Sequence, residues 1–559
     1  MDERSTSDQI LNRMASRKTL LQWGAAAAIA STAASVVQMG GVAEAVSRRR
    51  PSGGGFGGFE LQEATIARMQ AAMQAGAISS RELVLEYLDR IRTIDKRGPS
   101  LNSVIEVNPD ALAIAATLDR ERAAGRSRGP LHGVPILIKD NIGTADRMQT
   151  TAGSLALVGR PQPYDAFVVT QLRRAGAVIL GKTNLSEWAN FRSTHSTSGW
   201  SGRGGQNRNP YVLDRNPSGS SSGSAVAAAA NLAAGALGTE TDGSIVSPSG
   251  VNGVVGIKPT LGLTSRSGVV PISHSQDVVG PIARMVADAA AILSAIAGHD
   301  PTDRATGSSI GRRQPDYTRF LDPNGLRGAR LGIARQFGFG SSEKEDEVIN
   351  AAIDTLRRLG ATVIDEVTMP GAQALLTAPD ELTVLLYDFK VDINRYLQSR
   401  GSTVDVHSLA DLIRFNEQHA KQELPYFGQE LFHMAEAKGP LSSPEYRKAR
   451  ANNRRNSRQR GIDYAMAKHH LDALVAPTNA PAWTIDLVDG DHFLDGTATP
   501  AAVAGYPALT VPAGFIFELP IGITFFGRAY SEPTLIKIAS GFEAQTRVRR
   551  QPRFLPSVP

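Results

Sequence analysis

Residues 217–245 read Pro-Ser-Gly-Ser-Ser-Ser-Gly-Ser-Ala-Val-Ala-Ala-Ala-Ala-Asn-Leu-Ala-Ala-Gly-Ala-Leu-Gly-Thr-Glu-Thr-Asp-Gly-Ser-Ile. The stretch holds two Gly/Ser-rich loops, separated at 225–236 by small, mostly apolar residues. A helix that is apolar on nearly every face has to be buried. A Gly/Ser turn at its N-terminus would present hydroxyl groups and backbone N–H donors in a protected place. This pattern favours a site built from serines over the alternatives of a flexible linker or a simple turn.

Ser220 and Ser244 are the candidate reactive serines of the two loops, and Lys139 is their candidate base. Lys139 follows the apolar run 135–138. A lysine amine acts as a base only when neutral, and burial lowers its reference pKa of about 10.4. Taken singly, Lys139 is typical of a surface lysine and Ser244 of a turn serine. Together, one lysine and two serines suffice for nucleophilic catalysis without histidine.

Two rival motifs overlap the first loop. Residues 219–223 match G-x-S-x-G, the nucleophile elbow of α/β-hydrolases, with Ser221 as the nucleophile. That elbow requires a strand directly before it, whereas residues 214–217 are typical of a turn. A phosphate-binding loop would end in Gly-Lys-Ser/Thr, which is missing here. Both readings are therefore disfavoured.

Composition excludes several kinds of site. The chain has 559 residues, of which 42% are hydrophobic and 20% charged, as in ordinary soluble globular proteins. The absence of cysteine excludes disulfides, thiolate metal sites and a cysteine nucleophile. The net charge of +6 comes from 60 basic and 54 acidic residues, and no nucleic-acid-binding motif accompanies it. We expect no cofactor, no metal and no nucleic-acid partner.

The N-terminal residues 1–45 are typical of an export signal. Arg13, Arg17 and Lys18 precede an alanine-rich apolar stretch, and Ala43-Glu44-Ala45 is a small-x-small cleavage site. Residues 16–21 resemble the twin-arginine signal with Lys18 in place of the second arginine. No second apolar run is long enough to span a membrane. We expect an exported, periplasmic protein without a stable membrane span; an uncleaved buried helix is the alternative.

The remaining chain shows alternating strand and helix patterns. Residues 46–58 are typical of a flexible Gly-rich linker, and 59–559 form one predicted catalytic domain. The pattern predicts helices at 65–74, 80–94, 165–175 and 345–359, and strands at 134–138, 178–180, 331–334, 362–364 and 471–477. This alternation favours an α/β fold with helices on both faces of a sheet. Residues 380–470 differ: they predict a helical excursion, which includes long helices at 381–399 and 446–470.

The chain resembles the amidase signature family of serine hydrolases. The resemblance rests on Leu131-His132-Gly133-Val134-Pro135, Lys139-Asp140-Asn141, Thr151-Ala152-Gly153-Ser154, Gly181-Lys182-Thr183-Asn184, the 219–224 loop, residues 238–248, Ala504-Gly505-Tyr506-Pro507-Ala508, Leu519-Pro520-Ile521-Gly522-Ile523 and Glu532-Pro533-Thr534-Leu535. It implies a large mixed, twisted β-sheet. It also implies that Lys139 is the base, Ser220 the bridging serine (usually at a cis peptide bond) and Ser244 the acylated nucleophile. The N–H groups of Thr241, Asp242, Gly243 and Ser244 would form the oxyanion hole.

Three residues depart from the family pattern. Asp242 and Ser222 stand where glycine is usual, and Val246 where many members have arginine. Aspartate tolerates a left-handed backbone, so we expect the turn to survive, while its carboxylate would disfavour anionic substrates. The nearest resemblance is to the peptide amidase branch, which removes ammonia from C-terminally amidated peptides. We place specificity in 190–205 and 380–440.

The resemblance therefore implies an exported amidase that works through an acyl-Ser244 intermediate. Two alternatives remain. The same signature occurs in the glutaminase-type subunit of tRNA-dependent amidotransferases, against which the export signal argues. A non-catalytic binding protein of the same fold is the other alternative, against which the intact set of Lys139, Ser220 and Ser244 argues.

Overall fold

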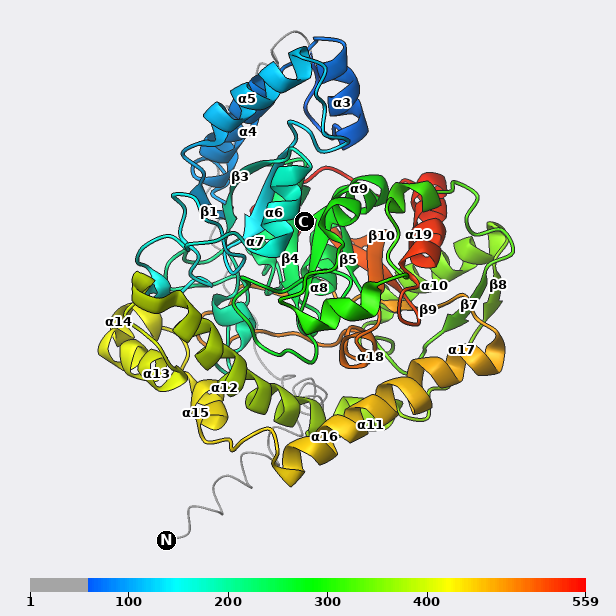
Figure 1. The fold of residues 1–559 in the computed structure, drawn as a ribbon. Coiled ribbons are helices and arrows are strands. Elements are labelled where there is room, and N and C mark those ends of the chain that lie inside the picture. Colours follow the sequence, from blue (N-terminus) through cyan, green and yellow to red (C-terminus); the bar gives the residue numbers. More distant parts are fainter. Residues whose placement is uncertain (1–58) are drawn as a thin grey trace, which may run out of the picture.

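A mixed sheet of eleven strands organises residues 59–559, the part of the chain that the computed structural model describes. The predicted signal at 1–45 and linker at 46–58 lie outside these residues. The strand order is β1-β3-β2-β4-β6-β5-β10-β11-β9-β7-β8 (Figure 1). The strands are β1 Val104–Val107, β2 Pro135–Lys139, β3 Val178–Thr183, β4 Gly235–Glu240, β5 Val255–Lys258, β6 Val278–Ala283, β7 Arg330–Ile333, β8 Thr362–Ile364, β9 Ala473–Pro477, β10 Ala508–Ile516 and β11 Leu519–Phe526.

Two groups of parallel strands flank an antiparallel centre, and the edge strand β1 pairs antiparallel with β3. Strands β3, β2 and β4 run parallel, and so do β9, β7 and β8. The central strands β4, β6, β5, β10, β11 and β9 pair antiparallel. The mixed sheet confirms the expected fold class. Strands β2, β3 and β4 are buried along their whole length, which explains why they are near-continuous apolar or small-residue runs.

Helices cover both faces of the sheet. They are α3 Ile66–Gln74, α4 Ser80–Arg90, α5 Ala111–Ala123, α6 Phe167–Arg174, α7 Ser222–Ala229, α8 Val246–Val251, α9 Val286–Ile296, α10 Glu343–Arg358, α11 Ala372–Thr377, α12 Asp380–Arg400, α13 Leu409–Gln418, α14 Ala420–Glu423, α15 Glu430–Glu436, α16 Pro444–Arg454, α17 Asp463–His469, α18 Thr499–Ala504 and α19 Glu532–Thr546. The predicted start of α4 is confirmed. Ser79 and Glu82 form a reciprocal capping box that satisfies two orphan N–H groups.

The helical excursion predicted over 380–470 is confirmed as α12–α17, and α12–α16 gather along one side of the sheet in Figure 1. A second hydrophobic cluster packs α12, α13 and α15 against residues 152–191 and 270–272. Phe389 of α12 is fully buried and lies 5.3 Å from the ring of Phe432 and 5.2 Å from that of Phe191. Among the described helices, none combines the length and apolar character that crossing a bilayer requires.

Three predicted helices end or break earlier than the sequence indicates. The alanine-rich helix α7 ends at Ala229, because Asn231 takes a left-handed conformation with φ of 56° and leads into β4. The basic helix expected over 446–470 is interrupted between α16 and α17, where Gly461 has φ −116° and ψ −118°. The helix expected at 80–94 changes from α to π geometry at Ile91.

Candidate active site

The candidate base and the second candidate serine come together because β2 and β4 are neighbouring parallel strands. Ile138 of β2 pairs with Leu237 of β4. Parallel strands end at the same edge of a sheet, and polar groups that follow them meet there. Lys139 is the last residue of β2, and Ser244 lies in the turn that follows β4. Strand order therefore explains how residues more than one hundred positions apart form one site.

Lys139 reaches the first serine loop directly. Its Nζ lies 2.7 Å from Ser220 Oγ and 3.0 Å from Ser221 Oγ. It also lies 2.9 Å from Thr239 Oγ1 and 3.3 Å from the Thr239 carbonyl oxygen. All four partners are neutral oxygens, and the lysine side chain has no solvent exposure. Lys139 therefore sits in a polar but uncharged cage.

This cage changes the acidity of Lys139. Burial lowers the pKa of Lys139 from 10.5 to about 7, because the cation loses its hydration. The carboxylates of Asp277 and Glu240 oppose this effect by favouring the cation. A lysine with this pKa is partly neutral at physiological pH and can accept a proton from Ser220.

The two serine loops are joined to each other. The backbone N–H of Ser221 donates to the carbonyl oxygen of Ser244 at 3.1 Å. The peptide bond between Gly219 and Ser220 is cis, as the resemblance implied. Residues 216–218, before the loop, are not a strand, so the α/β-hydrolase elbow is absent. Ser220 is fully buried, whereas Ser244 keeps 8% of its surface exposed.

Residues 241–244 form a tight turn with free donors. Within residues 59–559, the backbone N–H groups of Asp242, Gly243 and Ser244 donate to no protein acceptor. Gly243 has φ of +85°, which an L side chain rarely adopts. The left-handed conformation thus falls on Gly243, and the expectation that Asp242 would have to tolerate it is wrong. A turn with convergent, unpaired N–H groups can hold a developing oxyanion.

The carboxyl groups of Glu240, Asp277 and Asp242 hold the turn in place through hydrogen bonds. Glu240 accepts the N–H groups of Ile245 and Val246 at 2.7 and 3.0 Å. Thr241 Oγ1 donates to Asp277 at 2.6 Å, and Thr499 donates to Asp242 Oδ2 at 2.8 Å. The second oxygen of Asp242 is buried and has no partner within residues 59–559. The Asp242 carboxyl group expected beside the nucleophile is therefore held within the turn by Thr499.

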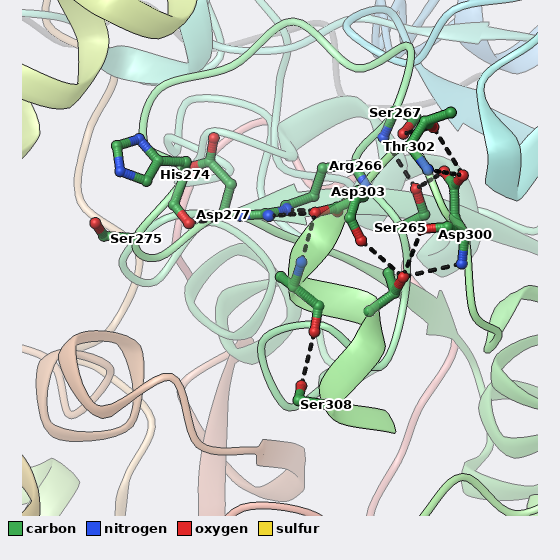
Figure 2. Close-up of polar contacts among 12 residues, drawn as sticks. Ser265, Arg266, Ser267, His274, Ser275, Asp277, Asp300, Thr302, Asp303 and Ser308 are labelled. Atoms are coloured by element: carbon green, nitrogen blue, oxygen red, sulfur yellow. Dashed lines mark hydrogen bonds and ion pairs between the residues drawn. The ribbon is translucent and has the colours of Figure 1, made fainter. Parts of the chain in front are cut away.

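A cavity of about 620 Å³ adjoins the site at Thr239, which contacts Lys139. Thr239, Thr241 and Asn141 line it, while Lys139, Ser220 and Ser244 do not. Arg266 and His274 also line the cavity. Figure 2 shows Arg266 directed at Asp303; the contacts measure 2.6 and 2.8 Å. The charged groups of the cavity wall are largely paired with each other.

The chain belongs to the amidase family, whose model matches residues 82–536. It is an amide hydrolase of the amidase signature family. A probable amidase of Arabidopsis thaliana is 45% identical over 504 residues, which cover 89% of this chain and 93% of that relative. The A subunit of glutamyl-tRNA(Gln) amidotransferase from Chloroflexus aurantiacus is 37% identical over 508 residues, which cover 88% of this chain and 98% of the relative.

Solved structures of the same family include peptide amidases that are more similar to this chain in sequence than the relatives above. The peptide amidase PAM in complex with the competitive inhibitor chymostatin is 54% identical, with a TM-score of 0.85 over 89% of this chain and 100% of that one. The native peptide amidase from Stenotrophomonas maltophilia is 54% identical, with a TM-score of 0.83 over 88% and 99%. The amidotransferase A subunit from Thermotoga maritima is 27% identical, with a TM-score of 0.65 over 89% and 99%.

The sequence missed the residues that surround the predicted ones. Thr239, which contacts Lys139, lies in the second Gly/Ser loop but is assigned no role there, and Asp277, which holds Thr241, belongs to no motif singled out in the sequence. Position 239 lies two residues after Leu237, whose strand β4 pairs with the strand of Lys139, so the period-2 rule could have indicated that Thr239 faces the same side of the sheet as Leu237. Asp277 enters the site from the loop before β6, and no local signal indicates that placement.

Proposed function

We propose that this amidase hydrolyses C-terminal peptide amides to the free acid and ammonia through an ester on Ser244. The observation that carries the proposal is the contact of 2.7 Å between Ser220 Oγ and the fully buried, partly neutral Lys139. The 54% identity to a peptide amidase supports the peptide amide over other amides. The lower identity to amidotransferase A subunits makes that alternative the weaker one.

The geometry supports one route for the proton and the acyl group. Neutral Lys139 takes the Ser220 proton while Ser220 takes the Ser244 proton, and Ser244 Oγ forms a bond to the carbonyl carbon. The N–H groups of residues 241–244 stabilise the resulting oxyanion. When the C–N bond breaks, Ser220 returns a proton to the departing nitrogen. Water then attacks the ester by the same relay, which releases the acid and restores Ser244.

Ammonia release from a substrate panel tests this proposal. The panel pairs peptide amides with aryl and short aliphatic amides, each assayed with wild type and Ser244→Ala. We expect peptide amides to give the highest kcat/KM and Ser244→Ala to lose turnover while its far-ultraviolet circular dichroism is unchanged. Ser222→Ala is the matched control, because its hydroxyl makes only long contacts of 3.4 and 3.5 Å. Turnover by Ser244→Ala would refute the acyl-enzyme, and preference for aryl amides would refute the substrate.

We also propose that residues 1–45 direct export to the periplasm, which rests on the sequence pattern alone. A fusion of residues 1–58 to a reporter enzyme tests it. We expect the reporter in the periplasm, cleaved after Ala45, and retention in the cytoplasm when Arg17 and Lys18 are both replaced by Gln. A reporter that stays in the cytoplasm without these changes would contradict export.

A further inference from the structure

Gln276 contacts the proposed oxyanion turn from the loop before β6. Its side chain is 2% exposed. Its Nε2 donates to the carbonyl oxygen of Thr241 at 3.2 Å and to Glu381 Oε1, at the start of α12, at 3.1 Å. Both partners are acceptors, so the amide nitrogen has to face them. Gln276 thus links the helical excursion to the turn that contains the nucleophile.

The position of this contact matters because peptide units are planar and trans. The Thr241 carbonyl and the Asp242 N–H belong to one peptide unit and point in opposite directions. A donor that holds the carbonyl on one side therefore directs the N–H to the other side. That N–H is one of the three in the turn that have no protein acceptor within residues 59–559. Gln276, which does not line the cavity, consequently sets the direction of a proposed oxyanion donor.

The loop that carries Gln276 is itself held firmly by α12. Asp388 accepts the Ser273 hydroxyl at 2.7 Å, and Asp392 accepts the His274 backbone N–H at 2.7 Å. The Asp277 carboxylate closes the loop by accepting the N–H groups of Ile272 and Ser273, each at 2.8 Å. Figure 2 shows His274, Ser275 and Asp277 along this loop. A firm loop is what an orienting contact requires, since a mobile one would not hold the peptide.

We propose that Gln276 is a positioning residue for the oxyanion hole and that Glu381 of α12 keeps it in place. This inference rests on the proposed function, because it assumes that an oxyanion forms at residues 241–244. Removal of one oxyanion donor costs about 10²–10³ in kcat in other hydrolases. A donor that is misdirected rather than removed should cost less, and we expect a loss of about 10- to 100-fold.

Gln276→Met tests the inference, since it nearly conserves volume and removes the donor. We expect kcat on a peptide amide to fall about 10- to 100-fold with KM changed less than about threefold, because the interaction acts in the transition state. Affinity for a peptide boronic acid, which forms a tetrahedral adduct on a serine, should fall in parallel with kcat. The matched control is Gln162→Met: Gln162 is also buried and donates to Tyr396 of α12 at 2.6 Å, away from the turn.

Two further variants keep the test decisive if Gln276→Met does not fold. Gln276→Glu keeps the size but places a carboxylate beside Glu381 and the Thr241 carbonyl, so kcat should fall at least as far. Glu381→Ala changes a half-buried side chain and should lower kcat about threefold to tenfold. In a Glu381→Ala, Gln276→Met double variant, the fold-loss in kcat should be smaller than the product of the two single fold-losses, because both residues act through the same contact.

The outcomes separate this inference from the proposed function. If kcat of Gln276→Met stays within twofold of wild type while Ser244→Ala is inactive, the positioning role is refuted and the acyl-enzyme stands. A rise in KM at constant kcat would also refute it, because Gln276 would then act on substrate binding. If Gln162→Met lowers kcat as much as Gln276→Met, the effect is general loosening of α12 and the inference fails. Turnover by Ser244→Ala would refute the proposed function itself.

Discussion

Replacement of Lys139 by methionine should make the protein inactive and, at neutral pH, more stable than expected from the lost hydrogen bonds. Methionine has a similar length and no charge to desolvate. The pKa of Lys139 is 10.5 in an unfolded chain and about 7 in the folded protein. Between these values the unfolded chain binds more protons than the folded one. Wild-type stability therefore falls as the pH is lowered from 10.5 to 7, and Lys139→Met lacks this dependence.

The size of this effect follows from the pKa shift. One pKa unit corresponds to about 1.4 kcal/mol. The shifted pKa of Lys139 lowers the free energy of unfolding of the wild type by about 4 kcal/mol at pH 7 and by about 1 kcal/mol at pH 10. The stability difference between Lys139→Met and wild type should thus shrink by about 3 kcal/mol between these pH values. Loss of the hydrogen bonds to Ser220, Ser221 and Thr239 changes the stability difference by the same amount at every pH. It therefore does not affect how that difference changes with pH.

Urea unfolding of both proteins at intervals from pH 7 to pH 10 measures this difference. The two m-values should agree, so that the change in midpoint reports stability alone. A difference that stays constant across this range would mean that Lys139 has an ordinary pKa in the folded protein. The proposed role of Lys139 as the base would then lose its physical basis.

Three other measurements follow from the structure. First, wild-type kcat/KM should rise with pH through an acid limb near pH 7, since only neutral Lys139 accepts a proton. Lys139→Ala should lack this limb and regain part of its activity at high pH. A wild-type kcat/KM that is flat from pH 5 to 9 would contradict both expectations. Second, Asp242→Asn should narrow the preference for neutral or cationic peptide amides over those with a carboxylate near the scissile bond; an unchanged ratio of kcat/KM values would remove that role of Asp242. Third, Phe389→Ala should lower the free energy of unfolding by about 3–5 kcal/mol, as measured in urea; a change below about 1 kcal/mol would show that the excursion does not depend on this core.

Sequence reasoning predicted the parts of this protein that local pattern controls. The helix expected from residue 80 begins there as α4, behind the capping box of Ser79 and Glu82, and the apolar run before Lys139 forms the expected strand, β2. The roles of Lys139, Ser220 and Ser244 came from the family resemblance, and the structure brings Lys139 to Ser220 and joins the loop of Ser220 to that of Ser244.

The remaining features depend on contacts between distant segments. Asp277 and Gln276 reach the turn only because β6 lies beside β4 in the sheet, which no residue near them signals. The break at Gly461 and the early end of α7 at Ala229 reflect tertiary packing that overrides helical periodicity. The left-handed residue of the turn also fell one position later than expected, on Gly243. The first three features follow constraints from outside the local sequence, whereas the conformation of Gly243 follows the local preference of glycine for positive φ.

The most direct test of the acyl-enzyme is mass spectrometry of the protein quenched in acid during turnover of a peptide amide. Acid stops deacylation because it protonates Lys139, and the ester survives proteolysis. We expect a mass increase equal to the acyl group on the peptide that contains Ser244, and no such increase in Ser244→Ala. An acyl group on Ser220 instead, or turnover without any covalent adduct, would contradict the account.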